Sequence, residues 1–288
     1  METIILQFFE TLRSDLATLV ACLFSLFGET MFLVVLLCAI YWIFDKKLGE
    51  RILLVTFSSM GLNGGLKTLF GRTRPYAAGV VSRVEVDNPL ISTIELDPQA
   101  SFPSGHSQMA GGLFFSCALH TRKAWGWIIF PLLTLGVMLS RLYFGVHYPT
   151  DVLVGAALGI SFAYFWDWVL RKGGKTLILS CIGFSLLSIL LAYLFPNKTQ
   201  IEICAMTLAG AICLPIEHKF IRFENTTGAK NKALRLLVGL VCVGIVYGGM
   251  SLLPFAFLEL LEWKFIKYFL TVVMAMIVTP ALFKKFKI

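Results

Sequence analysis

Long apolar segments recur along nearly the whole chain, separated by short polar connections. Most of them approach or reach the roughly 17 to 25 residues that a helix needs to cross the hydrocarbon core of a bilayer. Because a spanning segment must satisfy its own backbone hydrogen bonds, the pattern predicts an all-α polytopic transmembrane helix bundle. The spans are expected at roughly 31–44, 52–69, 106–119, 125–142, 151–170, 177–195, 201–215, 236–253 and 265–283.

The first part of the chain is harder to interpret, because the apolar run 16–44 is too long for one ordinary span. It is interrupted at Gly28-Glu29-Thr30, so residues 1–30 are expected to form a separate amphipathic or re-entrant helix. The amphipathic and the re-entrant arrangement both remain open. The expected organisation is therefore this N-terminal segment, a six-span core over 31–195 and about three additional C-terminal spans over 196–288.

Composition agrees with a membrane environment. Hydrophobic residues make up 57% of the chain and charged residues 15%. A chain of this composition is not expected to be soluble in water as a monomer. The seven cysteines fall inside apolar segments and are expected to be small buried residues without a disulfide framework.

The basic residues are distributed unevenly over the connections. Sixteen of the 25 Lys and Arg residues fall on one set of alternate connections, at 46–51, 122–123, 171–175, 219–235 and 284–287. By the positive-inside rule this side faces the cytoplasm. The net charge of +8 is then mostly a matter of topology, which removes the support for a nucleic-acid partner.

Three polar clusters fall at segment ends on the opposite, extracytoplasmic side. Ionisable groups at membrane depth are candidates for function, and helix ends at one level of a bundle can meet although they are distant in sequence. We expect the clusters to converge. They are Lys67 with Arg74-Pro75, then Pro103-Ser104-Gly105-His106, and finally Ser140-Arg141 with His147 and Asp151.

The second cluster is suited to binding an anion. Ser104 is expected to be the N-cap of the helix that follows, and free backbone N–H groups at such a start attract anions. Gly105 would let a phosphate approach without a side chain intervening. The alternative is that Ser104 and Gly105 only cap a membrane helix.

The third cluster is suited to nucleophilic chemistry. Pro149 is favourable at a first helical position, which places His147 just before a helix and Asp151 in its first turn. The carboxylate could then accept the imidazole proton and leave the other ring nitrogen as a base or nucleophile. For this cluster taken alone, the preferred interpretation is that Asp151 is a charge at a helix terminus and His147 an interfacial polar residue.

Cations accompany both histidines. Lys67, Arg74 and Arg141 could hold phosphate oxygens, since guanidinium groups match them in pairs and lysine supplies a compact charge. Arg72 is a candidate for a fourth charge, but snorkelling or contact with lipid headgroups is the preferred interpretation of Arg72 and Arg83.

Taken together, the clusters resemble the three-part signature of the type 2 phosphatidic acid phosphatase superfamily, which includes lipid phosphate phosphatases, undecaprenyl pyrophosphate phosphatases and glucose-6-phosphatase. The order and spacing of the signature are specific. All eleven signature positions are present, namely Lys67, Arg74, Pro75, Pro103, Ser104, Gly105, His106, Ser140, Arg141, His147 and Asp151.

The resemblance implies a role for each catalytic residue. His147 would attack phosphorus to give a phosphohistidine, Asp151 would orient it, and His106 would protonate the leaving alkoxide and then activate water. It also implies that the phosphoryl oxygens are held by the protein's own groups, without a metal or other cofactor. Those groups are Lys67, Arg74, Ser104, Gly105 and Arg141.

The expected function is hydrolysis of a lipid phosphate monoester or pyrophosphate in the cell membrane, with the substrate and membrane lipids as partners. A lipid phosphotransferase using the same site, a sugar-phosphate phosphatase and an anion transporter remain open, as does the oligomeric state. In the loop 76–102, runs 81–86 and 91–96 flank Asp87-Asn88-Pro89 and predict a small hairpin.

Overall fold

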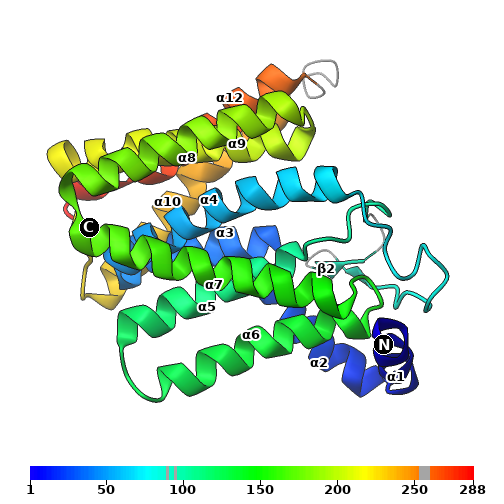
Figure 1. Ribbon diagram of the computed structural model, residues 1–288. Helices are drawn as coiled ribbons and strands as arrows, with labels where there is room; N and C mark the ends of the chain where they lie inside the picture. Colours follow the sequence, from blue (N-terminus) through cyan, green and yellow to red (C-terminus); the bar gives the residue numbers. More distant parts are fainter. Residues whose placement is uncertain (89–90, 94–95, 253–259) are drawn as a thin grey trace. The chain divides into compact units, whose positions relative to one another are not determined.

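The computed structural model describes residues 1–88, 91–93, 96–252 and 260–288, and over these ranges the chain is almost entirely helical (Figure 1). The prediction of an all-α membrane protein is therefore confirmed. The chain divides into two compact units. The first contains Met1–Val34 and Leu62–Asp167, and the second contains Val35–Gly61 and Trp168–Ile288.

In the first unit, three helices carry the predicted polar clusters at their ends. They are α5 (Gly105–Thr121), α6 (Gly126–Tyr143) and α7 (Pro149–Lys172), of which α7 continues beyond the unit. Helices α5 and α6 lie side by side. The end of α4 (Lys46–Phe70) enters the same unit from residue 62.

Backbone-to-backbone packing joins α5 to α7. A Cβ atom on Gly155 of α7 would lie 2.4 Å from the carbonyl oxygen of Ser104, and one on Gly111 of α5 would lie 2.7 Å from that of Ala156. With Gly159, one turn further along α7, Gly155 forms a pair of small residues at the four-residue spacing that permits close helix approach in membranes. The close packing fixes the start of α5 beside the first turns of α7.

The N-terminal segment adds three short helices to the first unit. They are α1 (Glu2–Thr11), α2 (Asp15–Ser25) and the 3₁₀ turn η1 (Leu26–Gly28), and both α1 and α2 lie against α6. Ser14 caps α2 by accepting a hydrogen bond from the backbone N–H of Ala17. The expected break at Gly28-Glu29-Thr30 is thus present, and α3 (Thr30–Ala39) begins after it.

The connection between α4 and α5 contains the short hairpin that was expected. Strands β1 (Asp87–Asn88) and β2 (Ile91–Ser92) pair antiparallel, with Asp87 opposite Ser92. The strands are two residues long, and β1 occupies the predicted turn instead of the run 81–86. In that run, the backbone of Val84 and Val86 bonds to Thr93 and Phe144. Part of the second predicted run, at 94–95, lies outside the described residues.

The second unit contains the remaining helices. Helix α9 packs against α8 and α12, and α10 also packs against α12. A network of ion pairs connects Lys46, Glu50 and Glu217, with Lys46 Nζ 2.6 Å from Glu217 Oε2. The elements are η2 (Ile40–Phe44), α8 (Gly174–Leu194), α9 (Lys198–Ile216), η3 (Glu217–Ile221), α10 (Ala229–Ser251), α12 (Leu261–Val273), η4 (Met274–Val278) and α13 (Thr279–Phe286).

Six helices among the described residues are long and apolar enough to cross a membrane, namely α6, α7, α8, α9 with η3, α10, and α12 through α13. The segments Asp15–Gly28 and Phe32–Phe44 meet that standard only as a pair. Helices α4 and α5 occur where spans were expected but are not among the six. Helix α5 is 17 residues long, and both helices carry buried polar residues, among them Ser58, Ser59 and Asn63 of α4 and Ser107 and Gln108 of α5.

Candidate active site

The imidazole of His147 lies in the short connection between α6 and α7 and is 2% exposed. Its Nε2 atom is 3.2 Å from Nη1 of Arg74. A guanidinium group can only donate hydrogen bonds, so Nε2 must be the accepting nitrogen and the ring proton must be on Nδ1. Nε2 therefore carries the lone pair that a nucleophile requires.

Asp151 lies in the first turn of α7, as expected, but it does not form the expected hydrogen bond with the imidazole. Its Oδ2 atom is 3.6 Å from Nδ1 of His147 and accepts hydrogen bonds from the Ser101 hydroxyl and the Tyr148 backbone N–H. The other oxygen, Oδ1, pairs with Arg72 at 2.6 Å. The carboxylate is completely buried, and these three donors compensate for its charge.

Burial, together with the positive charges of Arg74, Lys67 and Arg141, holds the pKa of His147 well below its ordinary value of 6.5. A buried imidazole surrounded by cations resists taking up a proton. His106 also acts on this ring. The sequence clusters thus converge around His147 within the first unit.

Two of the cations are held by carbonyl groups of the loop before α5. Lys67 donates to the carbonyl oxygen of Ala100, and Nε of Arg74 donates to that of Asp97 at 2.7 Å. Arg74 also donates to the carbonyl oxygen of Val146, next to His147. Because these acceptors are neutral, the hydrogen bonds themselves do not neutralise either side chain.

The start of α5 has the predicted cap geometry. Ser104 is the N-cap, and its hydroxyl oxygen accepts a hydrogen bond from the backbone N–H of Ser107. The Ser104 backbone N–H donates to the carbonyl oxygen of Asp151 at 3.0 Å, which ties the start of α5 to α7. Gly105 is the first helical residue and is partly exposed. The N–H of Gln108 also donates to the carbonyl oxygen of Ser104. The N–H groups of Gly105 and His106 are the ones that a helix start leaves to attract an anion.

The second imidazole belongs to His106, the second residue of α5. Its Nε2 atom is 3.0 Å from Oε1 of Glu29, at the end of η1, and the two side chains are 18% and 20% exposed. Arg141 lies in the last turn of α6 and is 1% exposed. Its Nη1 atom donates to the hydroxyl of Ser25 in α2 at 2.7 Å.

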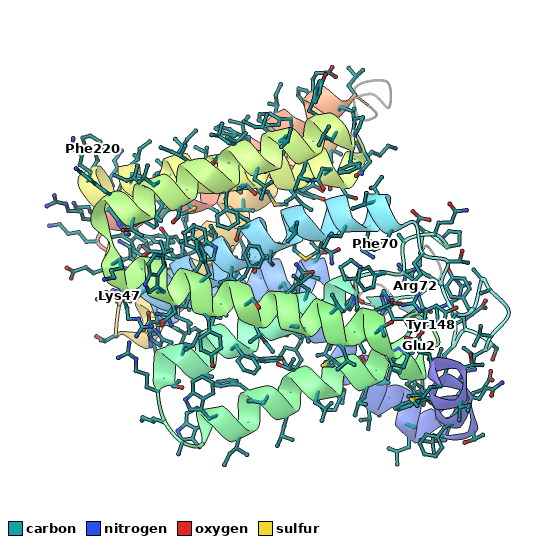
Figure 2. The ribbon with its side chains drawn as sticks, in the orientation of Figure 1. Glu2, Lys47, Phe70, Arg72, Tyr148 and Phe220 are labelled. Atoms are coloured by element: carbon teal, nitrogen blue, oxygen red, sulfur yellow. The ribbon has the colours of Figure 1, made fainter. Side chains whose placement is uncertain are left out.

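Arg72 was expected to contact lipid headgroups, and the structure shows otherwise. Besides Asp151, its guanidinium group bonds to Glu2 of α1 and Thr150 of α7, and it stacks over the ring of Tyr148 at 4.0 Å. Figure 2 shows Glu2, Arg72 and Tyr148 close to one another. Burial alone would raise the pKa of Glu2, but hydrogen bonds from Thr150 and Arg72 outweigh it and lower that pKa. Arg72 therefore belongs to the polar network that supports Asp151.

Sequence reasoning missed three residues of the N-terminal segment that contact the site, namely Glu2 at Arg72, Ser25 at Arg141 and Glu29 at His106. Glu29 was noticed only as an interruption of an apolar run, although a carboxylate at membrane depth is itself a signal of function. The glycine pair of α7, at a four-residue spacing in an apolar segment, was equally visible in the sequence. Glu2 and Ser25 carry no comparable local signal.

A different group of side chains could in principle ligate a metal ion. Glu50, Glu217 and His218, in the second unit, offer ligand atoms within 4.8 Å of one another. The Lys46 ammonium group already pairs with Glu217 there, and His218 Nε2 is 2.8 Å from Glu50. The contacts describe an ion-pair network that satisfies its own charges.

Comparison with known proteins identifies curated relatives over part of the chain. The bacitracin transport permease protein BcrC of Bacillus licheniformis is 39% identical over 27% of this chain and 38% of its own length. A decaprenylphosphoryl-5-phosphoribose phosphatase of Mycobacterium tuberculosis is 36% identical over 33% of this chain and 51% of that protein. Phosphatidylglycerophosphatase B of Bacillus subtilis is 34% identical over 39% and 53%. The chain thus spans about half the length of these relatives or less.

Two solved structures also align with the chain. They are LpxE of Aquifex aeolicus, at 28% identity and a TM-score of 0.46, and a transmembrane PAP2 type phosphatidylglycerolphosphate phosphatase of Bacillus subtilis, at 25% and 0.48. The alignments cover 56% and 60% of this chain, and 91% and 86% of those structures.

Two family models match consecutive parts of the chain. The PAP2 superfamily model matches residues 49–174, which include every predicted site residue, and the model of the transmembrane extension of PAP2 superfamily phosphatases matches residues 201–288. Residues 1–48, with Glu2, Ser25 and Glu29, lie outside both matches. The chain belongs to the PAP2 superfamily and is a multi-span membrane protein of that family.

Proposed function

We propose that this chain hydrolyses the phosphate monoester or pyrophosphate of a lipid at the site around His147. The names of its relatives support a lipid substrate, since two of them are phosphatases of decaprenylphosphoryl-5-phosphoribose and of phosphatidylglycerophosphate. The position of the site at the ends of membrane helices also favours a substrate that is itself anchored in the bilayer. The uneven distribution of Lys and Arg supports an extracytoplasmic site in the cell membrane.

One observation carries the proposal: Nε2 of a buried, neutral imidazole carries a lone pair that faces Arg74, while Lys67 and Arg141 add positive charge around the ring. In the first step, Nε2 of His147 forms a bond to phosphorus as the phosphorus–oxygen bond to the lipid breaks. The leaving oxygen takes a proton from His106. Asp151 would stabilise the positive charge that develops on the His147 ring, after a small movement closes the 3.6 Å gap to Nδ1.

In the second step, His106 takes a proton from a water molecule, whose oxygen attacks phosphorus. The phosphorus–nitrogen bond breaks, inorganic phosphate leaves and both imidazoles return to their initial states. Lys67, Arg74 and Arg141 would hold the phosphoryl oxygens throughout, together with the N–H groups at the start of α5. Preorganised donors of this kind can each contribute about 3 kcal/mol to stabilising a transition state.

The decisive experiment measures release of inorganic phosphate by the purified protein in detergent. The substrates are a panel of phosphatidic acid, phosphatidylglycerol phosphate, a polyprenyl pyrophosphate and glucose 6-phosphate. We expect lipid substrates to be preferred and His147→Ala to reduce release to background while the protein keeps its helical content. Full turnover by the His147→Ala variant would exclude the covalent mechanism, and release from no lipid in the panel would exclude the proposed substrate class.

A further inference from the structure

Glu29 and His106 form a second pair of carboxylate and imidazole in the site. The distance of 3.0 Å between Oε1 of Glu29 and Nε2 of His106 is that of a hydrogen bond. We propose that Glu29 is a positioning residue, which orients His106 and stabilises its protonated form during the reaction. The inference rests on the function proposed above and assigns a catalytic contribution to the N-terminal segment, outside the family-model matches.

The chemistry of the two groups decides which nitrogen exchanges protons. An ionised carboxylate only accepts hydrogen bonds, so Nε2 of His106 is the donor and carries a proton in this contact. Nδ1 is then the nitrogen that gives a proton to the leaving oxygen and later takes one from water. Without Glu29, the neutral ring could place its single proton on either nitrogen, and part of the population would hold the wrong tautomer.

The backbone around Glu29 is fitted to the imidazole. A Cβ atom on the preceding residue, Gly28, would lie 2.3 Å from Cδ2 of His106, so only glycine allows η1 to approach the ring this closely. One turn earlier, Ser25 accepts the hydrogen bond of Arg141. Contacts to two residues of the site therefore fix the segment that carries the carboxylate.

The charges around His106 show why a carboxylate is needed. Arg141 of α6, Lys67 of α4 and the imidazole of His147 are the other ionisable groups that act on the ring from the elements around it. Two of these are cations, and they oppose the positive charge that the ring must carry as an acid. The negative charge of Glu29 opposes their effect on the ring.

The test compares two substrates that differ in their need for a proton on the leaving group. An alkyl phosphate such as dodecyl phosphate expels a basic alkoxide, whereas 4-nitrophenyl phosphate expels a stable phenolate that departs without protonation. We expect Glu29→Gln to lower kcat/KM for the alkyl phosphate about tenfold to a hundredfold, because loss of a positioning residue removes part of the roughly hundredfold or more that general acid catalysis contributes. For the nitrophenyl ester the loss should be smaller than about threefold.

A pH profile provides the second measurement. Loss of the negative charge makes the protonated ring less stable, so the alkaline limb of kcat/KM for the alkyl phosphate should move to lower pH by about one unit in Glu29→Gln. Glu29→Asp, which keeps the charge on a shorter side chain, should partly restore the limb. Glu10→Gln is the matched control, because Glu10 fastens the same N-terminal segment to Ser82 and pairs with Arg13 inside that segment, without a contact to His106.

The outcomes separate this inference from the proposed function. Suppose that the wild type releases phosphate and His147→Ala does not. If Glu29→Gln then keeps the wild-type pH profile and loses kcat/KM equally for both substrates, the positioning role is wrong and the proposed function stands. An equal shift of the alkaline limb of kcat/KM in Glu10→Gln would also overturn the inference, since Glu29 would then act only by anchoring the N-terminal segment. Failure of the wild type on every phosphate would overturn the function itself.

Discussion

The backbone of Gly159 in α7 lies directly against the carbonyl group of Gln108 in α5, and a Cβ atom on Gly159 would stand 2.0 Å from that oxygen. No side chain can be accommodated at that distance without movement of a helix. Because α5 carries His106 and α7 follows His147, this contact controls the distance between the two imidazoles. Misplacement of reacting groups by about 1 Å can cost on the order of a hundredfold in rate.

We therefore expect Gly159→Ala to lower phosphate release at least about tenfold and to lower the thermal midpoint measured in detergent. Gly183 of α8 is the control, since nothing lies within 4 Å of a Cβ atom built there. Gly183→Ala should keep activity and leave the midpoint unchanged or higher, because alanine favours a helix over glycine. Equal behaviour of the two variants would mean that the contact between α5 and α7 does not set the geometry of the site.

The second prediction concerns Arg72 and Arg83, which are interpreted in the same way from the sequence alone, as arginines that contact lipid headgroups. Removal of Arg72 takes from the buried Asp151 its ion-pair partner at 2.6 Å, and a buried charge without its partner is strongly destabilised. Arg72→Ala should reduce kcat about tenfold or more, on the scale of one lost charge-assisted hydrogen bond. Arg83 pairs at 3.2 Å with Glu85, whose side chain is 71% exposed, and Arg83→Ala should change kcat little. Similar kcat values for the two variants would contradict a role for Arg72 in supporting Asp151.

The third prediction concerns the protonation of His147. Its pKa is lowered by burial and by the cations around it, so the ring should stay neutral in the folded protein at pH values where an ordinary histidine is already protonated. NMR of the protein with labelled histidine, assigned by comparison with His147→Gln, measures this directly. A His147 resonance that titrates near pH 6.5 would show that the cations do not act on the ring as described.

A consequence for stability follows from the same shift. In the unfolded chain His147 takes up a proton as the pH falls below about 6.5, whereas in the folded protein it does not. The contribution of this residue to folding stability should therefore decrease as the pH falls through that value and recover as it rises. The slope of the unfolding free energy against pH should be shallower in His147→Gln over the same interval.

The fourth prediction tests what holds the phosphoryl group. Vanadate imitates the transition state of phosphoryl transfer and should compete with the lipid substrate, because the same cations would surround its oxygens. Lys67→Ala and Arg141→Ala should weaken inhibition by vanadate along with activity. Activity should persist in a chelator of divalent ions. Loss of phosphate release on chelation, restored by adding a metal back, would contradict a site that relies on the protein's own charges.

Much of this arrangement was predictable from the sequence because the informative residues recur at fixed positions relative to helix ends. Ser104 before α5 and Pro149 at the start of α7 are local signals, and they located both helix starts correctly. The apolar segments likewise predicted the helices around them. Sequence rules sufficed for these features because helix starts and apolar segments depend on residues that are close together in the sequence.

The residues that sequence reasoning missed depend on contacts between distant segments. Arg72 resembles a lipid-facing arginine until α1 brings Glu2 beside it, 70 residues away in sequence. Glu29 acquires a partner only because η1 packs on the start of α5, 77 residues further along the chain. The gap between His147 and Asp151 has a similar cause, since Ser101 occupies the carboxylate from a third segment. Such contacts follow from tertiary packing, which no periodicity in the sequence encodes.

The loop that holds Lys67 and Arg74 does so through its main chain, by the carbonyl groups of Ala100 and Asp97. Every amino acid supplies a carbonyl group, so substitutions at these two positions leave both anchors in place. The side chains of this loop can therefore diverge while both cations remain held. Exchange of the loop between relatives would test whether its side chains select the substrate of the proposed reaction.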